Sequence, residues 1–110
     1  MSLLANTNWS LTITDNPDTM TIKFGPSMGP PGTSGGMCTI EEDSPSGNTS
    51  TPYVWVEQGN NFMLQAQNQN PGYSSLTTYS GTLTNGTGEG WFTNFLINFS
   101  NLSFSIKKIG

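Results

Sequence analysis

Residues 79–91 read YSGTLTNGTGEGW and have the pattern of a β-hairpin. Asn85-Gly86 separates the two arms. Asn-Gly is the strongest short-range hairpin signal, because a type I′ turn requires φ > 0 at both central residues. Glycine adopts that conformation without steric cost and asparagine tolerates it. Once this hairpin is fixed, the flanking stretches read as further strands of an antiparallel meander.

Alternation of apolar and polar residues extends outward from this hairpin in both directions. Trp9, Leu11 and Ile13 share one face of a stretch whose other face is polar, which is the pattern of a half-buried strand. Gly88 and Gly90 lie in the returning arm, where glycines suggest a bulge or bend that curls the sheet and leads Trp91 into the interior. The pattern predicts eight strands, at residues 9–15, 19–24, 37–42, 53–57, 61–67, 76–84, 88–99 and 102–109.

About eight short strands joined by turns indicate an all-β sandwich or barrel. The longest connections, residues 25–36 and 43–52, are rich in glycine, proline and serine and are predicted to be loops. Most other connections are short. This favours an antiparallel up-and-down meander closing into a barrel over a β-sandwich, because closure removes exposed edges. Residues 1–110 are expected to form a single domain, with residues 1–6 a flexible N-terminus or residues left by an expression vector.

The composition limits the classes of function. Only 9% of the residues are charged, against roughly 25% in a typical protein. The net charge is −4, with three lysines and no arginine, which argues against a nucleic-acid partner. No stretch approaches the ~20 apolar residues of a membrane span. The profile is typical of secreted, periplasmic or cell-surface β-proteins, and we expect such a location, with any leader removed. The sequence leaves the oligomeric state open.

Four short motifs together resemble those of the lipocalin-like (calycin) barrels. They are Asn8-Trp9-Ser10, Tyr79-Ser80-Gly81-Thr82-Leu83, Gly88-Glu89-Gly90-Trp91 and Phe104-Ser105-Ile106-Lys107-Lys108. The chain departs from the family pattern at Thr7, where a glycine is usual, and lacks the arginine that commonly packs over the first-strand tryptophan. The resemblance implies an eight-stranded barrel without enzymatic activity that binds a small apolar ligand in its lumen.

The candidate site residues follow from this fold. Trp9 is expected to close one end of the barrel. Glu57 and Glu89 are expected to lie at its rim, where a carboxylate could orient a polar ligand or, if desolvated, act as a base. The predicted ligand-binding lining is aromatic or apolar: Trp9, Tyr53, Trp55, Phe62, Leu64, Tyr79 and Trp91.

Other chemistry finds little support in the sequence. The chain has no histidine, which excludes Ser-His-Asp and Cys-His catalysis and most zinc and iron sites. Residues 41–43 form the single acidic cluster. Adjacent strand residues point to opposite faces, so a solvated strand end is preferred there to a calcium or glycosidase site. No cofactor, metal site or catalytic residue is predicted. Two alternatives stay open: an extracellular sandwich that binds carbohydrate or a protein through exposed aromatics, and a small hydrolase or isomerase that uses Glu57 or Glu89.

Overall fold

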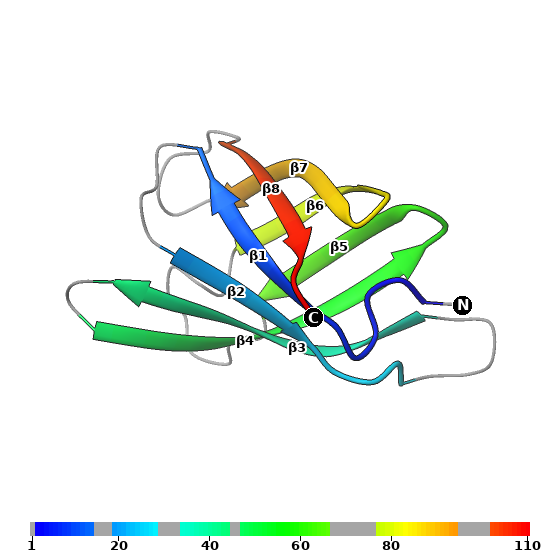
Figure 1. The fold of residues 1–110 in the computed structure, drawn as a ribbon, viewed down its shortest axis with the longest axis horizontal. Coiled ribbons are helices and arrows are strands. Elements are labelled where there is room, and N and C mark those ends of the chain that lie inside the picture. The colour runs from blue at the N-terminus through cyan, green and yellow to red at the C-terminus, as the bar shows by residue number, and fades with distance from the viewer. Residues whose placement is uncertain (1, 15–18, 29–33, 45–46, 67–76, 95–101) are drawn as a thin grey trace.

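A computed structural model describes residues 2–14, 19–28, 34–44, 47–66, 77–94 and 102–110 (Figure 1). No helix in this part of the chain is long and apolar enough to cross a membrane. The described ranges contain eight strands: β1 (Asn8–Ile13), β2 (Thr19–Phe24), β3 (Ser34–Ser44), β4 (Gly47–Gln58), β5 (Asn61–Ala66), β6 (Thr77–Thr84), β7 (Thr87–Asn94) and β8 (Leu102–Lys108).

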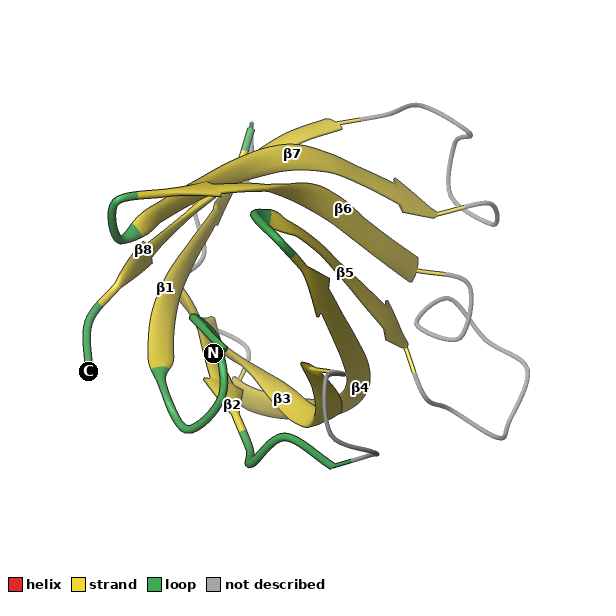
Figure 2. Cartoon of the chain, turned by 90° about the vertical axis from the view of Figure 1, so that its right-hand side faces the viewer, coloured by secondary structure: helices red, strands yellow, loops and turns green. Residues whose placement is uncertain are grey.

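The strands form a closed antiparallel barrel in which each strand pairs with its neighbours in the sequence. Closure occurs between the first and last strands, where Leu11 pairs with Ile106 and Ile13 with Phe104. Figure 2 shows this ring of strands. The predicted meander barrel is therefore confirmed, and a sandwich of two separate sheets is not formed.

The hairpin between β6 and β7 turns at the predicted dipeptide. Asn85 has φ 49° and Gly86 has φ 81°, so both central residues adopt the positive φ that a type I′ turn requires. The register runs from Thr84 paired with Thr87 to Thr77 paired with Asn94. The turn therefore fixes which residues of the two strands lie opposite each other.

The hydrophobic core is the interior of the barrel, and it is built by the period-two alternation of the strands. In β5, for example, Phe62, Leu64 and Ala66 are buried while the residues between them are exposed. The strands β1, β2, β4, β6 and β8 contribute buried side chains in the same way. The faces predicted for residues 9–13, 20–24 and 61–66 are confirmed.

The hairpin of β3 and β4 is much longer than the sequence predicted. Its register pairs Asp43 with Asn48 and Thr39 with Pro52, so the described residues of the expected 43–52 loop are strand residues. In Figure 1 this hairpin extends beyond the other strands. Threonine favours strands and asparagine is depleted in them, and both preferences depend on context, so cross-strand pairing decides the structure here.

Candidate functional site

Six of the seven side chains predicted to line the lumen lie inside the barrel. All six are buried, and Trp55 and Leu64 have no exposed surface. Their predicted role in binding a ligand stays a prediction. The six are Trp9, Tyr53, Trp55, Phe62, Leu64 and Tyr79.

Aromatic rings pack against one another across the barrel interior. Tyr79 of β6 contacts Phe104 of β8 with ring centroids 5.3 Å apart, and Phe104 contacts Phe62 of β5 at 6.0 Å. Tyr79 also contacts Tyr53 of β4 at 5.8 Å. All three pairs are edge-to-face, an arrangement that favours aromatic pairs beyond their burial alone. Protein side chains therefore fill the interior at this level.

Two phenol groups lie within this apolar interior. The Tyr53 side chain is hydrogen-bonded to Thr77 and to Tyr79. Burial raises the pKa of Tyr53 to about 12, although those hydrogen bonds lower it in part. Burial raises the pKa of Tyr79 as well, and the negative charge of Glu42 adds to the effect. Both phenols are therefore neutral at physiological pH.

The N-terminal segment, residues 2–6, is packed against the barrel. Leu4 is completely buried. The Glu57 carboxylate accepts hydrogen bonds from Ser2 Oγ at 2.8 Å and from the backbone N–H groups of Leu3 at 2.9 Å and Leu4 at 3.3 Å. Glu57 is thus engaged by this segment. Adjacent Leu3-Leu4 was the available sequence signal for such packing.

Trp9 lies at the same end of the barrel. Its Nε1 donates a hydrogen bond of 2.8 Å to Thr7 Oγ1, and the Thr7 hydroxyl in turn donates to the Leu4 carbonyl. Trp9 and Leu3 both line a cavity of about 350 Å³ beside the Asn85-Gly86 turn. The first-strand tryptophan therefore links the barrel wall to the N-terminal segment.

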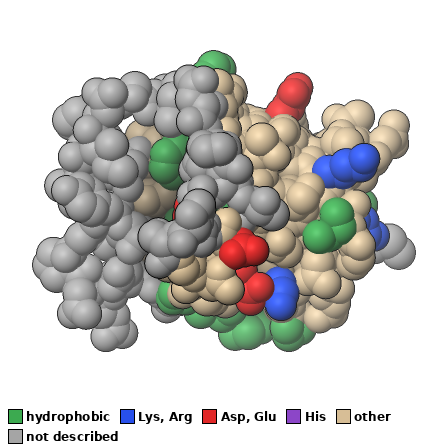
Figure 3. Space-filling view, turned by 60° about the vertical axis from the view of Figure 1, so that its left-hand side comes forward, with side chains coloured by type: hydrophobic (Ala, Val, Ile, Leu, Met, Phe, Trp, Pro, Cys, Tyr) green, Lys and Arg blue, Asp and Glu red, His purple; other side chains and the backbone are tan. Residues whose placement is uncertain are grey.

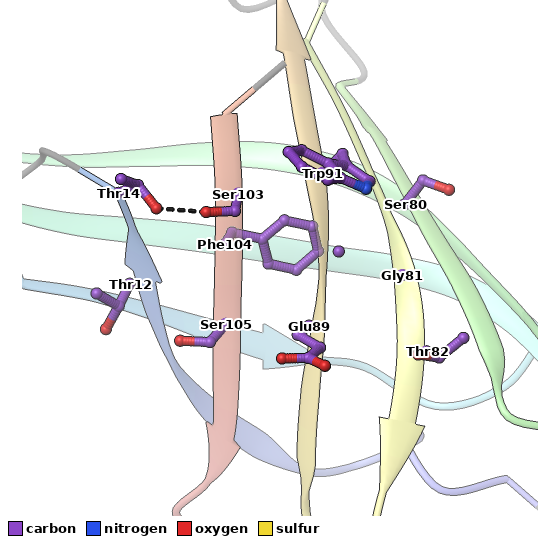
Figure 4. Close-up of a pocket in the computed structure, with 11 residues that line it drawn as sticks. Thr12, Thr14, Ser80, Gly81, Thr82, Glu89, Trp91, Ser103, Phe104 and Ser105 are labelled. Carbon is purple, nitrogen blue, oxygen red and sulfur yellow. Dashed lines mark hydrogen bonds between the residues drawn. The ribbon is translucent and has the colours of Figure 1, made fainter.

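The prediction that Trp91 lines the lumen is wrong. Trp91 is 58% exposed and projects from the outer face of β7, and Glu89, two residues earlier, is exposed on the same face (Figure 4). Glu89 therefore does not lie at the rim beside the lumen. The inward positions of β7 are Gly88, Gly90 and the partly buried Phe92.

The glycines explain this orientation. Gly90 lies directly opposite Gly81 of β6. A Cβ atom at Gly90 would collide with the Ser80 carbonyl oxygen, and one at Gly81 would collide with the carbonyl oxygen of Glu89. The two backbones approach so closely that neither position has room for a side chain. Trp91, the next residue, consequently points outward.

Trp91 and Glu89 border a groove of about 560 Å³ on the outer face of β1, β6, β7 and β8. Figure 4 shows Trp91 and Glu89 on one strand, flanked by hydroxyl side chains from the strands on either side. Two of these hydroxyls, on Thr14 and Ser103, are hydrogen-bonded to each other. The side chains of Thr12, Thr14, Ser80, Thr82, Ser103 and Ser105 supply the hydroxyl groups, and the buried Phe104 is also part of the lining.

These hydroxyl residues are not among the site residues predicted from the sequence, which are aromatic, apolar or acidic. The signal was present in the alternation: Ser103 and Ser105 occupy the outward positions of β8, next to inward Phe104 and Ile106. What the sequence could not provide was the register that aligns them with Trp91. In the barrel, Trp91 pairs with Ser103 on one side and with Ser80 on the other.

Among the described residues, the other acidic side chains and Cys38 form no comparable cluster of polar groups beside an exposed aromatic side chain. Glu41 forms an ion pair of 3.3 Å with Lys23, and both side chains are largely in solvent. Figure 3 shows acidic side chains beside a lysine on the described part of this face. Cys38 is buried, and this burial raises its thiol pKa to about 12, so the unreactive protonated form prevails. In the described residues, no group of three or more potential metal ligands is found.

Comparison of this chain with protein-family models, curated proteins and solved structures finds no match. The architecture itself, a closed eight-stranded antiparallel barrel, is consistent with a lipocalin-like barrel.

Proposed function

We propose that this protein is a carbohydrate-binding module whose outer groove holds a neutral sugar against Trp91. The observation that carries the proposal is the position of Trp91: a 58% exposed indole at the edge of a groove lined by serine and threonine hydroxyls. Tryptophan is enriched at binding interfaces, where its ring packs against a ligand and its N–H stays polar, so an exposed indole beside a groove favours a binding surface.

The chemistry of the groove suits a sugar. A sugar ring has an apolar C–H face and an edge of hydroxyl groups. The flat indole of Trp91 offers an apolar surface, and its N–H remains a hydrogen-bond donor. The surrounding hydroxyl side chains both donate and accept, and the Glu89 carboxylate accepts. The groove thus combines an apolar platform with several groups that can bond sugar hydroxyls.

Charge favours a neutral ligand over an anion. Glu89 is the one charged side chain among the described residues that line the groove, and the chain carries a net charge of −4. A quaternary ammonium ligand is a poorer fit, because such cations are held by cages of several aromatic faces. Of the two aromatic side chains in the lining, Trp91 is exposed and Phe104 is buried.

The proposal is tested by calorimetric titration with a panel of neutral oligosaccharides. Trp91→Ala should weaken binding of any sugar ligand at least tenfold, and Glu89→Gln should weaken it severalfold. Ile109→Ala is the matched control, because Ile109 is also 58% exposed but is not part of the groove lining. Unchanged affinity in the Trp91 variant, or saturable binding of choline in place of sugars, would overturn the proposal.

The closed barrel supports a second candidate function, the binding of a small apolar ligand in the lumen. In this case the protein would be a lipocalin-like barrel. The observation in its favour is the burial of six predicted lining residues in one interior. Such a ligand has to share that space with the packed rings of Phe62, Tyr79 and Phe104. Titration with an apolar fluorescent probe tests this candidate in Trp91→Phe, where the remaining tryptophans are buried. If the probe still quenches the tryptophan fluorescence of this variant, lumen binding is supported. If the probe causes no quenching, lumen binding is contradicted.

A further inference from the structure

A second groove lies next to the first on the outside of the barrel. It has a volume of about 380 Å³ and covers β4, β5 and β6. Its lining shares Ser80, Gly81 and Thr82 of β6 with the groove that contains Trp91. One short stretch of β6 therefore forms the wall between the two grooves.

The residue of this wall that lies between Trp91 and Met63 has a small side chain. Ser80 pairs with Met63 of β5 on one side and with Trp91 of β7 on the other. These three residues form one outward-facing row across three strands. Adjacent strands are about 4.8 Å apart, so Trp91 and Met63 are separated by about 10 Å. Because Ser80 projects little between two large side chains, a ligand lying on Trp91 can continue over β6 to Met63.

The second groove repeats the chemical character of the first. Met63 is 43% exposed and its partner Val56 is 51% exposed, and together they form an apolar surface. Gln58 and Asn61 supply side-chain amides, which donate and accept hydrogen bonds. No charged side chain is among the described residues that line this groove. An uncharged ligand with apolar faces and hydroxyl edges fits both grooves.

We infer that the ligand is an extended neutral glycan chain, bound along the row from Trp91 across Ser80 to Met63 and Val56. The inference depends on the proposed carbohydrate binding and specifies the ligand as a chain of several sugar units. The continuity of the two grooves through their shared wall is the basis for extending one ligand over both. Mono- and disaccharides occupy the Trp91 groove alone, and longer oligomers gain contacts with Met63.

A chain-length series tests this inference. Soluble neutral polysaccharides (glucans, xylans, mannans and galactans) are screened by affinity electrophoresis, and oligomers of one to six units prepared from the one that binds are titrated into the protein. The expected result is an affinity that increases at least tenfold from the disaccharide to the longer oligomers and then levels off. Met63→Ala should remove most of that increase. Val56→Thr, which retains a β-branched side chain, should also reduce the gain in affinity with chain length.

The controls separate the two proposals. Thr84→Gln changes another exposed, outward residue of β6 that lines neither groove, and should leave the whole series unchanged. If disaccharide and hexasaccharide bind equally well through Trp91, or if Met63→Ala and Val56→Thr both leave the gain intact, the extended-chain inference is overturned while carbohydrate binding stands. If no oligomer binds, or if Trp91→Ala has no effect on any of them, both proposals are overturned.

Discussion

Replacing Gly90 with alanine tests the close approach of β6 and β7, on which the outward orientation of Trp91 depends. The new Cβ atom would overlap the Ser80 carbonyl oxygen and the Cα of Gly81. Both are backbone atoms, so relief requires the two strands to move apart. Forcing an extra carbon into a packed site costs about 1–3 kcal/mol. Because the neighbours of Gly90 are backbone atoms, the cost of Gly90→Ala should lie at the upper end, about 3 kcal/mol.

A stabilising effect of alanine, exerted through the unfolded chain, has to be subtracted from this cost. Alanine restricts the unfolded chain more than glycine does, which stabilises the folded state by about 0.4–1 kcal/mol. The net loss in the free energy of unfolding is therefore about 2 kcal/mol, and the melting temperature should fall by about 8 °C. Urea unfolding followed by circular dichroism measures this loss directly.

Gly88→Ala is the matched control on the same strand and the same face. Its Cβ would meet Ile106 Cγ1 and Leu83 Cδ2, each at 2.9 Å. These atoms belong to side chains, which can shift more easily than a backbone carbonyl, so the net loss should be smaller than that of Gly90→Ala. A Gly90→Ala protein that is as stable as Gly88→Ala would refute the backbone-contact explanation.

Three further predictions concern buried or engaged polar groups. Glu57→Gln should lower the free energy of unfolding by about 2 kcal/mol, because the amide replaces a carboxylate that accepts three hydrogen bonds. Stability should fall above about pH 9, where the unfolded state releases the Cys38, Tyr53 and Tyr79 protons while the folded state keeps them, because burial raises all three pKa values. The rise of the Tyr53 pKa from 10.0 to about 12 corresponds to about 3 kcal/mol of this loss, complete by about pH 12. Cys38 should resist a thiol reagent at mildly alkaline pH in the folded protein and react rapidly in urea, because burial raises its pKa to about 12.

Each of these predictions has its own control. Asp43→Asn changes an exposed acid and should leave the free energy of unfolding unchanged, in contrast to Glu57→Gln. Tyr53→Phe should reduce the loss of stability between pH 10 and 12 by about 3 kcal/mol and leave the part caused by Tyr79 and Cys38, and an unaltered pH profile in that variant would assign the whole loss to other groups. Rapid labelling of Cys38 in the folded protein would contradict its burial.

The closed barrel could be predicted because local signals agreed with the global fold. Asn85-Gly86 defines a turn, and the alternation around Leu11, Ile22 and Leu64 indicates which face is buried. Where every second residue of a strand is apolar, only one orientation of the strand buries the apolar face.

The orientation of β7 could not be predicted in this way. Trp91 and Phe92 are adjacent and both are aromatic, so either phase of the strand places a large ring inside. The phase is decided by the pairing of Gly90 with Gly81, which is a contact between strands. The hydroxyl-lined groove depends on the same register. The packing of residues 2–4 could not be predicted because it depends on Glu57, more than fifty positions away in the sequence.

The proposed sugar site is tested most directly by the indole N–H signals of the three tryptophans in a two-dimensional NMR titration. Trp9 Nε1 is bonded to Thr7 and Trp55 Nε1 to the Met37 carbonyl at 3.1 Å, whereas Trp91 is exposed. Titration with the oligosaccharide that binds best should shift the Trp91 signal in a saturable manner and leave the other two in place. Shifts confined to Trp9 or Trp55, or no saturable shift with any neutral oligosaccharide, would contradict the assignment of the site to the outer groove.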